Sequence, residues 1–451
     1  MTVDLSSIVK AYDVRGVVPD QLNPDIARAL GAAFARFVGG PTIVTARDMR
    51  ESGVPLGTAF AEGVTSQGVN VVESGLGSTD LLYYAAGSMN IPGAMFTASH
   101  NPAKYNGIKL CLAGAKPVGQ ESGLVQIREE AERFLDSGIP QADVVGTVTQ
   151  QDVLAGYAAY MKHLVPDLAG IRPLKVVVDA DNGMGGHTVP TTFEGLPLEV
   201  SEMYFELDGS FPNHEANPID PENLRDLQKA VLAAGADLGL AFDGDADRCF
   251  VVDERGEIVS PSTLTALIAE RELRRAPGST VIHNLITSRS VPEVITENGG
   301  TPVRTRVGHS FIKAKMAEHD AVFGGEHSGH FYFRDFWNAD SGMLAALHTL
   351  AALGHFEGTL SELLASYDRY VASGEINSTV DDQAGRVAAI KAAYAGKPQD
   401  ELDGLTVDLG EGAWFNVRAS NTEPLLRLNV EAADEVRMSD VRDEVLALIR
   451  T

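Results

Sequence analysis

The sequence predicts an α/β fold with mixed sheets, followed by a smaller C-terminal α+β unit. Apolar runs of strand length alternate with helical patterns along most of the chain, which is typical of sheets covered by helices. This alternation starts afresh at "LKVVVDADNGMGG" (174–186) and at "STVIHNL" (279–285), whereas the end of the chain is rich in strands. We therefore expect three α/β units and one smaller unit, with boundaries at 1–150, 151–256, 257–368 and 369–451.

The first unit shows the alternation most clearly. "PTIVTARD" (41–48) predicts a strand that ends in polar residues, and "SGVPLGTAFAEGVTSQG" (52–68) predicts a helix. Two further strands are expected at 69–75 and 93–100, "VNVVESG" and "GAMFTASH". Strands joined through helices in this way favour a parallel or mixed sheet.

The later units follow from shorter patterns. "DLGLAFDGDADRCFVVDERG" (237–256) predicts two strands around an acidic loop, and "AVFGGEHSGH" (321–330) predicts a strand and a glycine-rich loop. In the last unit, 404–432 is strand-rich, and "SDVRDEVLALIR" (439–450) predicts a helix that begins at its Ser/Asp pair. The small and polar residues of "VASGEINSTV" (371–380) favour a linker that joins this unit to the rest.

The composition limits the partners. Lys and Arg total 36 against 62 Asp and Glu, so the net charge of −26 disfavours nucleic acid and anionic membranes as partners. Cys111 and Cys249 lie in apolar runs, as expected of buried, reduced thiols in a cytoplasmic protein. The chain begins without the apolar core of a signal peptide, and its longest apolar tract is too short to span a bilayer. We expect a cytoplasmic protein whose anionic ligands are held by local positive charge.

The hexapeptide "DGDADR" is the most informative motif. Asp243, Asp245 and Asp247 alternate in a loop that follows a strand, where their carboxylates can converge on one cation. Three neighbouring anions repel one another unless a metal is present, and a set of oxygen ligands favours Mg²⁺ or Ca²⁺.

Two other interpretations compete with a metal site in this motif. An EF-hand loop would place Glu254 at its twelfth position, but its sixth position is Arg248 instead of glycine, and the flanking residues resemble strands. An ordinary solvated acidic turn is the second alternative, because "DGD" turns are common.

Two further motifs carry polar side chains suited to a phosphorylated sugar. In "RASNTEP" (418–424) a guanidinium and short polar side chains can donate hydrogen bonds to phosphate oxygens, although an ordinary polar turn explains it equally well. In "GGEHSGH" (324–330), Glu326, Ser328 and His330 alternate and face one side if the segment is extended, although a glycine-rich turn is equally possible.

Two weaker motifs complete the set. "AYDVRG" (11–16) places Tyr12 and Arg15 before a glycine, and in isolation it favours a turn with a surface arginine. "RVGHSFIK" (306–313) contains His309, which is either a base or the start of a helix.

Ser99 in "TASHNP" is the candidate for covalent chemistry. The segment lacks the glycines of a serine-hydrolase elbow, and a dyad with His100 is not expected, because adjacent side chains usually point apart. A hard metal, a phosphate loop and a sugar loop together serve phosphoryl transfer. Ser99 is therefore interpreted as a phosphoryl carrier whose phosphate binds the metal and is flanked by Arg15, His100 and Lys109.

Taken together, the motifs resemble the α-D-phosphohexomutase superfamily, and within it the bacterial phosphomannomutase/phosphoglucomutase enzymes. "TASHNP", "DGDADR", "GEHSGH" and "RASNTEP" occur in the order found in that family, so the resemblance covers essentially the whole chain. It implies a heart-shaped four-domain protein, with three related α/β domains and a fourth domain outside that set. The implied reaction interconverts hexose 6-phosphate and 1-phosphate through a phosphoserine and a hexose 1,6-bisphosphate, which also serves as activator.

The resemblance implies a role for each motif. Ser99 would be the phosphoserine and, with the three aspartates, would hold Mg²⁺. Arg248 would orient the sugar, and Glu326 and Ser328 would bind its hydroxyls, with His330 nearby. The phosphate that is not transferred would be held by the last loop, and other residues would surround the serine or line the cleft: Arg418, Ser420, Asn421, Thr422, Tyr12, Arg15, His100, Lys109 and His309.

One departure and several alternatives remain. Some relatives carry a lysine as a proton-transfer candidate where this chain has "HNLITSR" (283–289), which leaves Lys109 and His309 as candidates for the base. The sugar loop resembles that of bacterial phosphomannomutases, whose product feeds GDP-mannose and related nucleotide sugars, but a main activity on glucose phosphates is an alternative. A metal-dependent sugar phosphatase and a non-enzymatic sugar- or Ca²⁺-binding module are the rival functions. The expected partners are small hexose phosphates, and the protein is expected to be a monomer or a small homo-oligomer.

Overall fold

The protein is described from a computed structural model that covers residues 3–420 and 424–450. The chain forms two compact units. Unit 1 consists of residues 1–259 and 328–361, and unit 2 of residues 260–327 and 362–451. Within the described residues, none of the helices combines the length and the apolar character needed to span a bilayer. The division into four units at the predicted boundaries stays a prediction.

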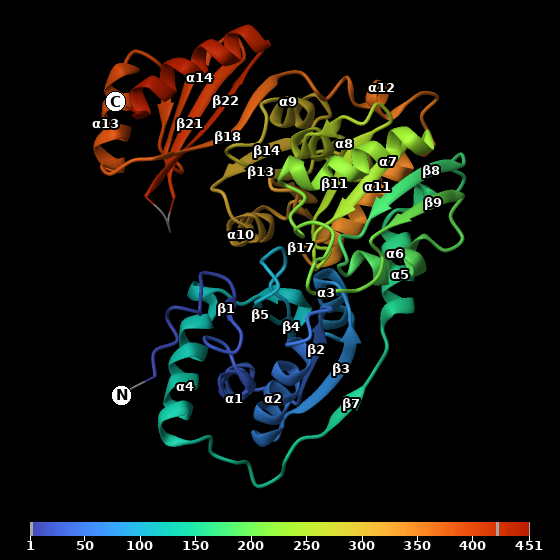
Figure 1. Ribbon diagram of the computed structural model, residues 1–451, viewed down its shortest axis with the longest axis vertical. Coiled ribbons are helices and arrows are strands. Elements are labelled where there is room, and N and C mark those ends of the chain that lie inside the picture. The colour runs from blue at the N-terminus through green and yellow to red at the C-terminus, as the bar shows by residue number, and fades with distance from the viewer. Residues whose placement is uncertain (1–2, 421–423, 451) are drawn as a thin grey trace. The chain divides into compact units, whose positions relative to one another are not determined.

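The first sheet of unit 1 has the strand order β1-β5-β4-β2-β3-β7, with β6 beside β5 (Figure 1). β2 pairs in parallel with β3 and β4, whereas β4 and β1 pair antiparallel with β5, so the sheet is mixed, as predicted. The predicted strands are confirmed as β2, β3 and β4. The bounds are β1 (Val14–Val17), β2 (Thr42–Arg47), β3 (Asn70–Leu76), β4 (Gly93–Phe96), β5 (Tyr105–Leu112), β6 (Lys116–Pro117) and β7 (Val148–Gln150).

Three helices cover one face of this sheet, and their apolar residues form its core. They are α1 (Pro24–Val38), the predicted helix α2 (Gly53–Ser66) and α4 (Leu124–Ser137), while α3 (Thr79–Met89) packs against β2 and β4. α1 begins at Asn23, whose side chain accepts the N–H groups of Asp25 and Ile26, and ends at Gly39 in the left-handed conformation.

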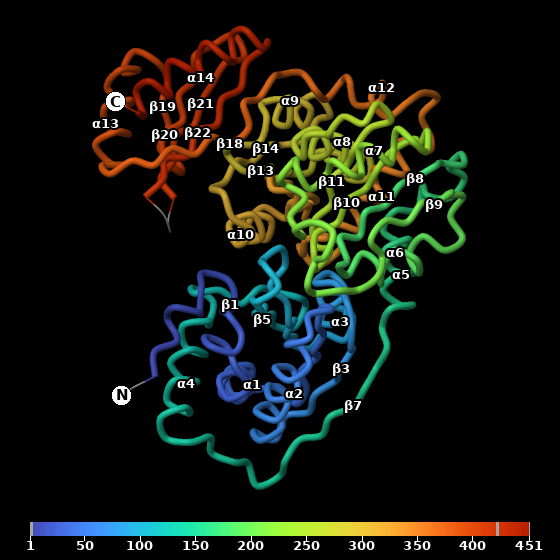
Figure 2. The backbone as a smooth tube through the Cα atoms, in the orientation of Figure 1, coloured from blue at the N-terminus to red at the C-terminus, as the bar shows by residue number. Residues whose placement is uncertain are grey.

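An extended segment leads from α4 to the second sheet. Figure 2 follows it from the end of α4 through β7 to α5 (Leu154–Leu164). β7 pairs with β3 in parallel and is exposed along its length. The segment therefore adds an edge strand to the first sheet before the chain enters the next one.

The second sheet of unit 1 has the order β12-β11-β10-β8-β9. β8 pairs in parallel with β9 and β10, whereas β10 and β11 are antiparallel neighbours. The unit also contains an antiparallel pair, β16 and β17, and the helices α6, α7 and α11. The bounds are β8 (Leu174–Asp179), β9 (Leu198–Met203), β10 (Leu238–Phe242), β11 (Cys249–Asp253), β12 (Ile258–Val259), β16 (Phe331–Phe333), β17 (Ala339–Asp340), α6 (Gly185–Phe193), α7 (Arg225–Ala234) and α11 (Gly342–Gly354).

The first three strands of unit 2 are parallel to one another. β13 pairs in parallel with β14 on one side and β15 on the other, and the predicted strands at 279–285 and 321–330 are confirmed as β13 and β15. The bounds are β13 (Thr280–Asn284), β14 (Thr301–Thr305), β15 (Phe323–Gly325), α8 (Pro261–Arg275), α9 (Ser290–Glu297), α10 (His309–His319) and the short α12 (Leu360–Leu364), whose last three residues belong to unit 2.

The C-terminal sheet is antiparallel, in the order β18-β22-β21-β20-β19, and α13 and α14 pack on one of its faces (Figure 1). This confirms the smaller α+β unit. The bounds are β18 (Val371–Thr379), β19 (Gln399–Asp400), β20 (Leu405–Gly410), β21 (Ala413–Ala419), β22 (Leu425–Ala432), α13 (Gln383–Ala393) and α14 (Glu435–Arg450).

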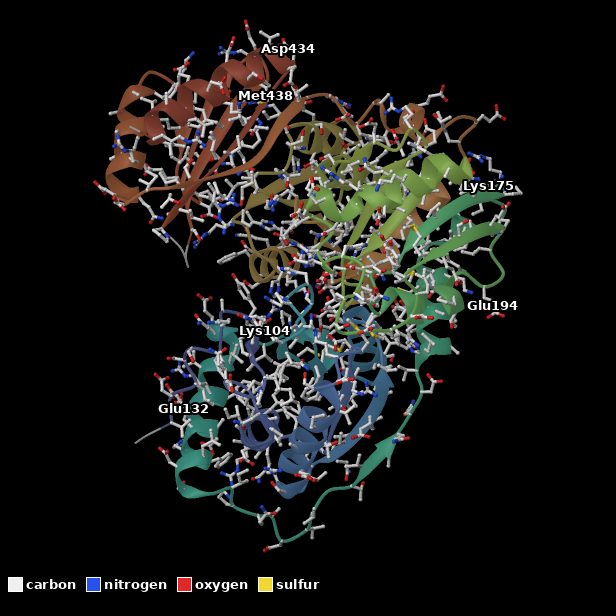
Figure 3. All side chains as sticks on the ribbon, in the orientation of Figure 1. Lys104, Glu132, Lys175, Glu194, Asp434 and Met438 are labelled. Carbon is white, nitrogen blue, oxygen red and sulfur yellow. The ribbon has the colours of Figure 1, made fainter. Side chains whose placement is uncertain are left out.

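Two predictions about this unit were wrong in detail. The expected linker at 371–380 is the strand β18, because its backbone pairs with β22 over most of its length. The final helix begins at Glu435, before the expected Ser/Asp pair, because the side chain of Asp434 accepts the N–H of Arg437 at 2.9 Å. Figure 3 labels Asp434 and Met438 at this end of α14.

Candidate active site

Ser99 lies in a short loop that follows β4, which we call the serine loop (residues 97–101). Its φ of 48° is in the left-handed region, an unusual conformation for a residue other than glycine. The backbone N–H of Ser99 donates to Thr97 Oγ1 at 2.9 Å, and its side-chain hydroxyl donates to Asp243 Oδ2 at 2.9 Å. The loop thus directs a buried hydroxyl at the acidic loop that the sequence marked as a metal site.

Arg50 holds the serine loop in place. Its buried guanidinium donates to the carbonyls of Ser99 (2.8 Å) and Asn101 (2.7 Å), and it pairs with Asp48 at 3.2 Å. Sequence reasoning missed this residue. The available signal was a charged pair in "ARDMR" directly after a buried strand, where charged side chains of α/β proteins usually meet a site.

His100 lies closer to the serine than expected. Its Nδ1 is 3.2 Å from Ser99 Oγ, because the left-handed backbone at Ser99 turns the two neighbouring side chains toward each other. Burial, with the positive charges of Arg248 and Arg15, lowers the pKa of His100 to about 3. The imidazole is therefore neutral at physiological pH, and it forms an uncharged hydrogen bond with the hydroxyl of Ser99.

The three aspartates lie in the turn between β10 and β11, which we call the acidic loop (residues 243–248). Their carboxylate oxygens lie within 4.8 Å of one another, and all three side chains are buried. Strands flank the loop on both sides, which excludes the EF-hand alternative, and burial excludes the solvated turn. A Cβ on Gly244 would lie 2.7 Å from the carbonyl oxygen of Ser99, so the two loops approach too closely for any side chain there.

Lys109 on β5 neutralises part of this charge. Its Nζ lies 2.8 Å from Asp245 Oδ2 and 2.6 Å from Asp247 Oδ2. Burial raises the pKa of Asp243 to about 8, whereas Lys109 and His330 hold the pKa of Asp247 at about 2 although burial opposes this. Lys109 similarly keeps the pKa of Asp245 below its usual value, against burial and the charge of Asp247.

The donor set fits a hard divalent cation. Oδ1 of Asp245 and Oδ1 of Asp247 are buried and have no hydrogen-bond partner within residues 3–420 and 424–450. Buried carboxylate oxygens of this kind are costly unless a cation approaches them. Asp247 also belongs to a second group with His330 and Asp340, whose ligand atoms lie equally close together.

The N-terminus of α3 supports the acidic loop from the first sheet. Thr79 donates from its hydroxyl to Asp245 Oδ2 at 2.6 Å and from its backbone N–H to the Asp245 carbonyl at 2.9 Å. Beside it, the buried Asp80 accepts from the hydroxyls of Ser341 at 2.6 Å and Tyr157 at 2.9 Å. Sequence reasoning passed over "GSTD" (77–80), although a Ser/Thr/Asp cluster is a usual helix start.

A charged trio supports the acidic loop from the other side. His214 places Nε2 3.0 Å from Asp179 and Nδ1 3.0 Å from Asp181. Although burial opposes the charge, these carboxylates raise the pKa of His214 to about 11. Met184 lies three residues after Asp181, and its backbone N–H donates to the carbonyl of Gly244 at 2.9 Å. The trio therefore anchors a backbone segment that contacts the acidic loop.

Other predicted residues meet the two loops within unit 1. Arg248 is buried and pairs with Asp243, with Nε 2.9 Å from Oδ2. Arg15 on β1 contacts Asn101 of the serine loop and pairs with Asp13 at 2.5 Å, while Tyr12 is half-buried in the turn before β1.

Two residues of the predicted sugar loop also lie in unit 1. Ser328 Oγ is 3.1 Å from His330 Nδ1, and His330 Nε2 is 3.6 Å from Asp247 Oδ1. His330 therefore approaches the acidic loop. Residues 327–329 form a turn and are not extended, so the glycine-rich turn is the alternative that the structure shows, and Ser328 and His330 contact each other across it.

The remaining predicted residues lie in unit 2. Glu326 is buried and accepts the backbone N–H of Gly308 at 3.1 Å, beside His309, which is the first residue of α10. Arg418 lies on β21 and Ser420 just after it, whereas Asn421 and Thr422 fall outside the described residues. Arg418 is buried and forms an ion pair with Glu375 of β18.

Comparison with known proteins gives a consistent result. Four domain families described as "Phosphoglucomutase/phosphomannomutase" match in order: domain I at residues 6–134, domain II at 157–256, domain III at 260–370 and the C-terminal domain at 375–448. A phosphomannomutase of Escherichia coli is 39% identical over an alignment of 455 positions, covering 98% of each chain. A phosphomannomutase/phosphoglucomutase of Pseudomonas aeruginosa is 38% identical, covering 97% of this chain and 94% of that one.

A solved structure agrees with these relatives. The crystal structure of a phosphoglucomutase/phosphomannomutase family protein from Burkholderia thailandensis has a TM-score of 0.88 and 33% identity, and the alignment covers 99% of this chain and 98% of that one. The resemblance inferred from the four motifs is thereby confirmed. The chain belongs to the phosphoglucomutase/phosphomannomutase family and is an intramolecular phosphotransferase.

Proposed function

We propose that this enzyme is a phosphomannomutase that interconverts mannose 6-phosphate and mannose 1-phosphate through a phosphoserine at Ser99. The observation that carries the proposal is the position of the Ser99 hydroxyl, 2.9 Å from Asp243 at the edge of three buried carboxylates. A phosphate at that position would lie beside the cationic groups of Lys109, Arg248 and Arg15. Positioning and charge neutralisation of this kind supply most of the catalysis in phosphoryl transfer.

Each half of the reaction exchanges one phosphoester for another. The bond between phosphorus and Ser99 Oγ breaks while a bond forms to a sugar hydroxyl oxygen; the sugar hydroxyl proton passes to a base, and Ser99 Oγ leaves as an alkoxide that takes up a proton. The product is a hexose 1,6-bisphosphate, which turns and returns its other phosphoryl group to Ser99. Of the two candidates for the base, His309 in unit 2 remains, because, although burial opposes the charge, Asp245 and Asp247 hold Lys109 as a cation and keep its pKa well above the usual value.

The acidic loop would hold Mg²⁺ with an oxygen of the phosphoserine. The ion would supply positive charge at the phosphoryl oxygens. Residues of this chain do the rest. Arg50 and Thr97 fix the serine loop, Lys109 balances the carboxylates, and Arg248 is held by Asp243 close to Ser99.

The substrate contacts divide between sugar and phosphate. Glu326 and Ser328 would bind the sugar hydroxyls, with His330 nearby, and Arg418, Ser420, Asn421 and Thr422 would bind the phosphate that is not transferred. Neither contact set addresses the configuration at C2, the only difference between mannose and glucose. Activity on glucose phosphates is therefore expected as well, and one relative carries both activities in its name.

The test is a parallel assay with mannose 1-phosphate, glucose 1-phosphate and glucosamine 1-phosphate, each with its matching 1,6-bisphosphate. We expect isomerisation of the first two and no net release of inorganic phosphate. Steady phosphate release at every turnover would identify a sugar phosphatase instead. Isomerisation of glucosamine 1-phosphate alone would contradict the proposed substrate.

A further inference from the structure

The face of the C-terminal sheet opposite α13 and α14 carries a row of polar residues. The helices bury the alternate residues, among them Val417 and Leu428. On the other face, β21 and β22 place Asn416 opposite Asn429 and Arg418 opposite Arg427. Two arginines directly opposite each other on neighbouring strands repel and destabilise the pair unless an anion lies between them.

Glu375 of β18 supplies that anion. Its Oε2 contacts Nη2 of Arg418, and its Oε1 lies 3.3 Å from Nη1 of Arg427. Asn377, and not Glu375, is the direct cross-strand neighbour of Arg427, so Glu375 reaches the two arginines diagonally. One carboxylate thus spans both guanidinium groups, and we call these residues the arginine pair (Arg418 and Arg427) and its bridge (Glu375).

The bridge leaves donors of the arginine pair unused. The side chain of Arg418 is only 7% exposed, and its Nη1 has no hydrogen-bond partner within the described part of the chain. Arg427 directs its Nη2 toward Ser420 Oγ at 3.5 Å, at the start of the predicted phosphate loop. Two guanidinium groups against one carboxylate leave a positive charge, with a buried donor that an anion can satisfy.

We propose that Glu375 is a positioning residue for phosphate recognition, and that it acts by holding Arg418 and Arg427 as one unit. The inference rests on the proposed role of Arg418 and adds two residues to it. Arg427 is the second guanidinium of the site, and Glu375 fixes the spacing and direction of both.

The geometry indicates that Glu375 positions the two arginines and does not compete with phosphate for them. A guanidinium has several N–H donors in a rigid fork, and Glu375 uses one nitrogen of each arginine. A carboxylate on β18 cannot follow the substrate, because the strand is paired with β22 along most of its length. Glu375 therefore orders the donors that face the loop and leaves them available to the ligand.

The test compares three variants. Glu375→Gln keeps the shape and removes the charge, Glu375→Asp keeps the charge but is one methylene too short to span both arginines, and Glu411→Gln is the matched control. Glu411 is exposed at the turn between β20 and β21, in the same sheet, so its replacement changes the net charge equally. The readouts are kcat and KM for mannose 1-phosphate, the inhibition constant of inorganic phosphate and the melting temperature.

We expect Glu375→Gln to raise KM and the phosphate inhibition constant together, by roughly 2- to 10-fold, as for a typical hydrogen bond, because both arginines remain; the change in kcat should be smaller. Glu375→Asp should be intermediate, and Glu411→Gln should match the wild type. Tighter phosphate inhibition in Glu375→Gln would mean that the carboxylate competes with the ligand and would overturn the proposal. Equal effects in Glu375→Gln and Glu411→Gln would overturn it too.

A double-mutant cycle with Arg427→Ala shows whether Glu375 acts through the arginine pair. Residues of one ion-pair network are not additive, so Glu375→Gln should add little to Arg427→Ala. Full additivity would contradict the bridge. If the wild type has mutase activity and the Glu375 variants have the same kcat and KM as the wild type, only this inference is refuted. If the wild type has no mutase activity, the proposed function is refuted.

Discussion

Around Ser99 three carboxylates share one ammonium and one guanidinium, whereas on the C-terminal sheet two guanidinium groups share one carboxylate. Both clusters are held by a partner of opposite sign: Lys109 bridges Asp245 and Asp247, and Glu375 bridges Arg418 and Arg427. Both also keep a buried polar atom without a hydrogen-bond partner among the described residues, a carboxylate oxygen in one and a guanidinium nitrogen in the other.

The difference between the clusters is the kind of polar atom that remains without a partner among the described residues. The acidic loop keeps carboxylate oxygens, which suit a divalent cation, and the arginine pair keeps guanidinium donors, which suit a phosphate. In each case the bridging residue lowers the repulsion that the free protein must bear, without satisfying these atoms. The two clusters differ in support as well, since Arg50, Thr79 and His214 brace the loops around Ser99 from several elements.

Of the changes that test the difference between the two clusters, removal of the Ser99 hydroxyl should have the largest effect. We expect Ser99→Ala to lose at least about 10³-fold in kcat, as for other nucleophiles that form covalent intermediates. Intact-mass measurement should show a phosphorylated fraction in the active wild type and none in the variant. A fully active Ser99→Ala would refute the role of Ser99 as phosphoryl carrier. It would also refute the proposal that the acidic loop holds a metal together with a phosphoserine.

The next test separates metal binding from the ion pair that Asp245 forms with Lys109. Asp245→Asn should reduce kcat by about 10²-fold or more, because a metal ligand is lost. Its melting temperature should fall, because the lowered pKa of Asp245 means that its charge stabilises the fold through the ion pair with Lys109. The matched control is Asp143→Asn, an exposed residue in the segment before β7.

Chelation of the wild type should have the same effect on kcat as Asp245→Asn and should be reversed by added Mg²⁺. Activity that survives exhaustive chelation, or an Asp245→Asn variant as active as Asp143→Asn, would contradict the metal assignment.

Arg418→Ala probes the opposite cluster. Loss of a charged hydrogen-bonding contact is worth about 1.5–3 kcal/mol, which predicts a drop in kcat/KM of roughly 10- to 150-fold. The drop should be similar for mannose and glucose phosphates, because the contact does not address C2. Arg418→Lys should recover only part of it, because lysine lacks the forked geometry.

Glu326→Ala is the comparison variant, since it should act through the sugar and not through the phosphate. Measurement of kcat/KM on both substrates, together with phosphate inhibition, separates the two. If phosphate inhibits Arg418→Ala as strongly as it inhibits the wild type, Arg418 does not bind the phosphate.

Much of the architecture followed from periodicity and from motifs. The βαβ alternation located β2, α2, β3 and β4, and the apolar runs located β8, β10, β11 and β13. The errors lie in the last unit. "VASGEINSTV" looked like a linker because small and polar residues hide the alternation of a strand whose residues are mostly exposed. The start of α14 was misplaced because Asp434 and Ser439 are both acceptable caps, and only the fold selects between them.

The residues of the candidate site divide more sharply into those that the sequence predicted and those that it did not. Residues in contiguous motifs, such as Asp243, Asp245 and Asp247, were found because their spacing alone brings them together. Arg50, Thr79 and His214 were missed because their partners lie far along the chain, 166 residues away for Thr79 and Asp245. A bridge such as Glu375, which contacts two other strands, is visible only once the strand order is known.

The last prediction uses His214, whose positive charge lies between Asp179 and Asp181 behind the acidic loop. Its pKa is raised to about 11 in the folded protein against about 6.5 in an unfolded chain. The stabilisation is therefore complete below about pH 6.5 and is lost as the pH rises toward 11. We expect the free energy of unfolding to fall by on the order of 2 kcal/mol between pH 7 and 9 from this group alone. In His214→Asn this slope should become shallower, leaving the part that Asp243 contributes up to about pH 8, and in His163→Asn, a control histidine on α5, it should be unchanged. Denaturant unfolding at a series of pH values measures the difference, and parallel slopes in the wild type and His214→Asn would show that His214 is not held as a cation.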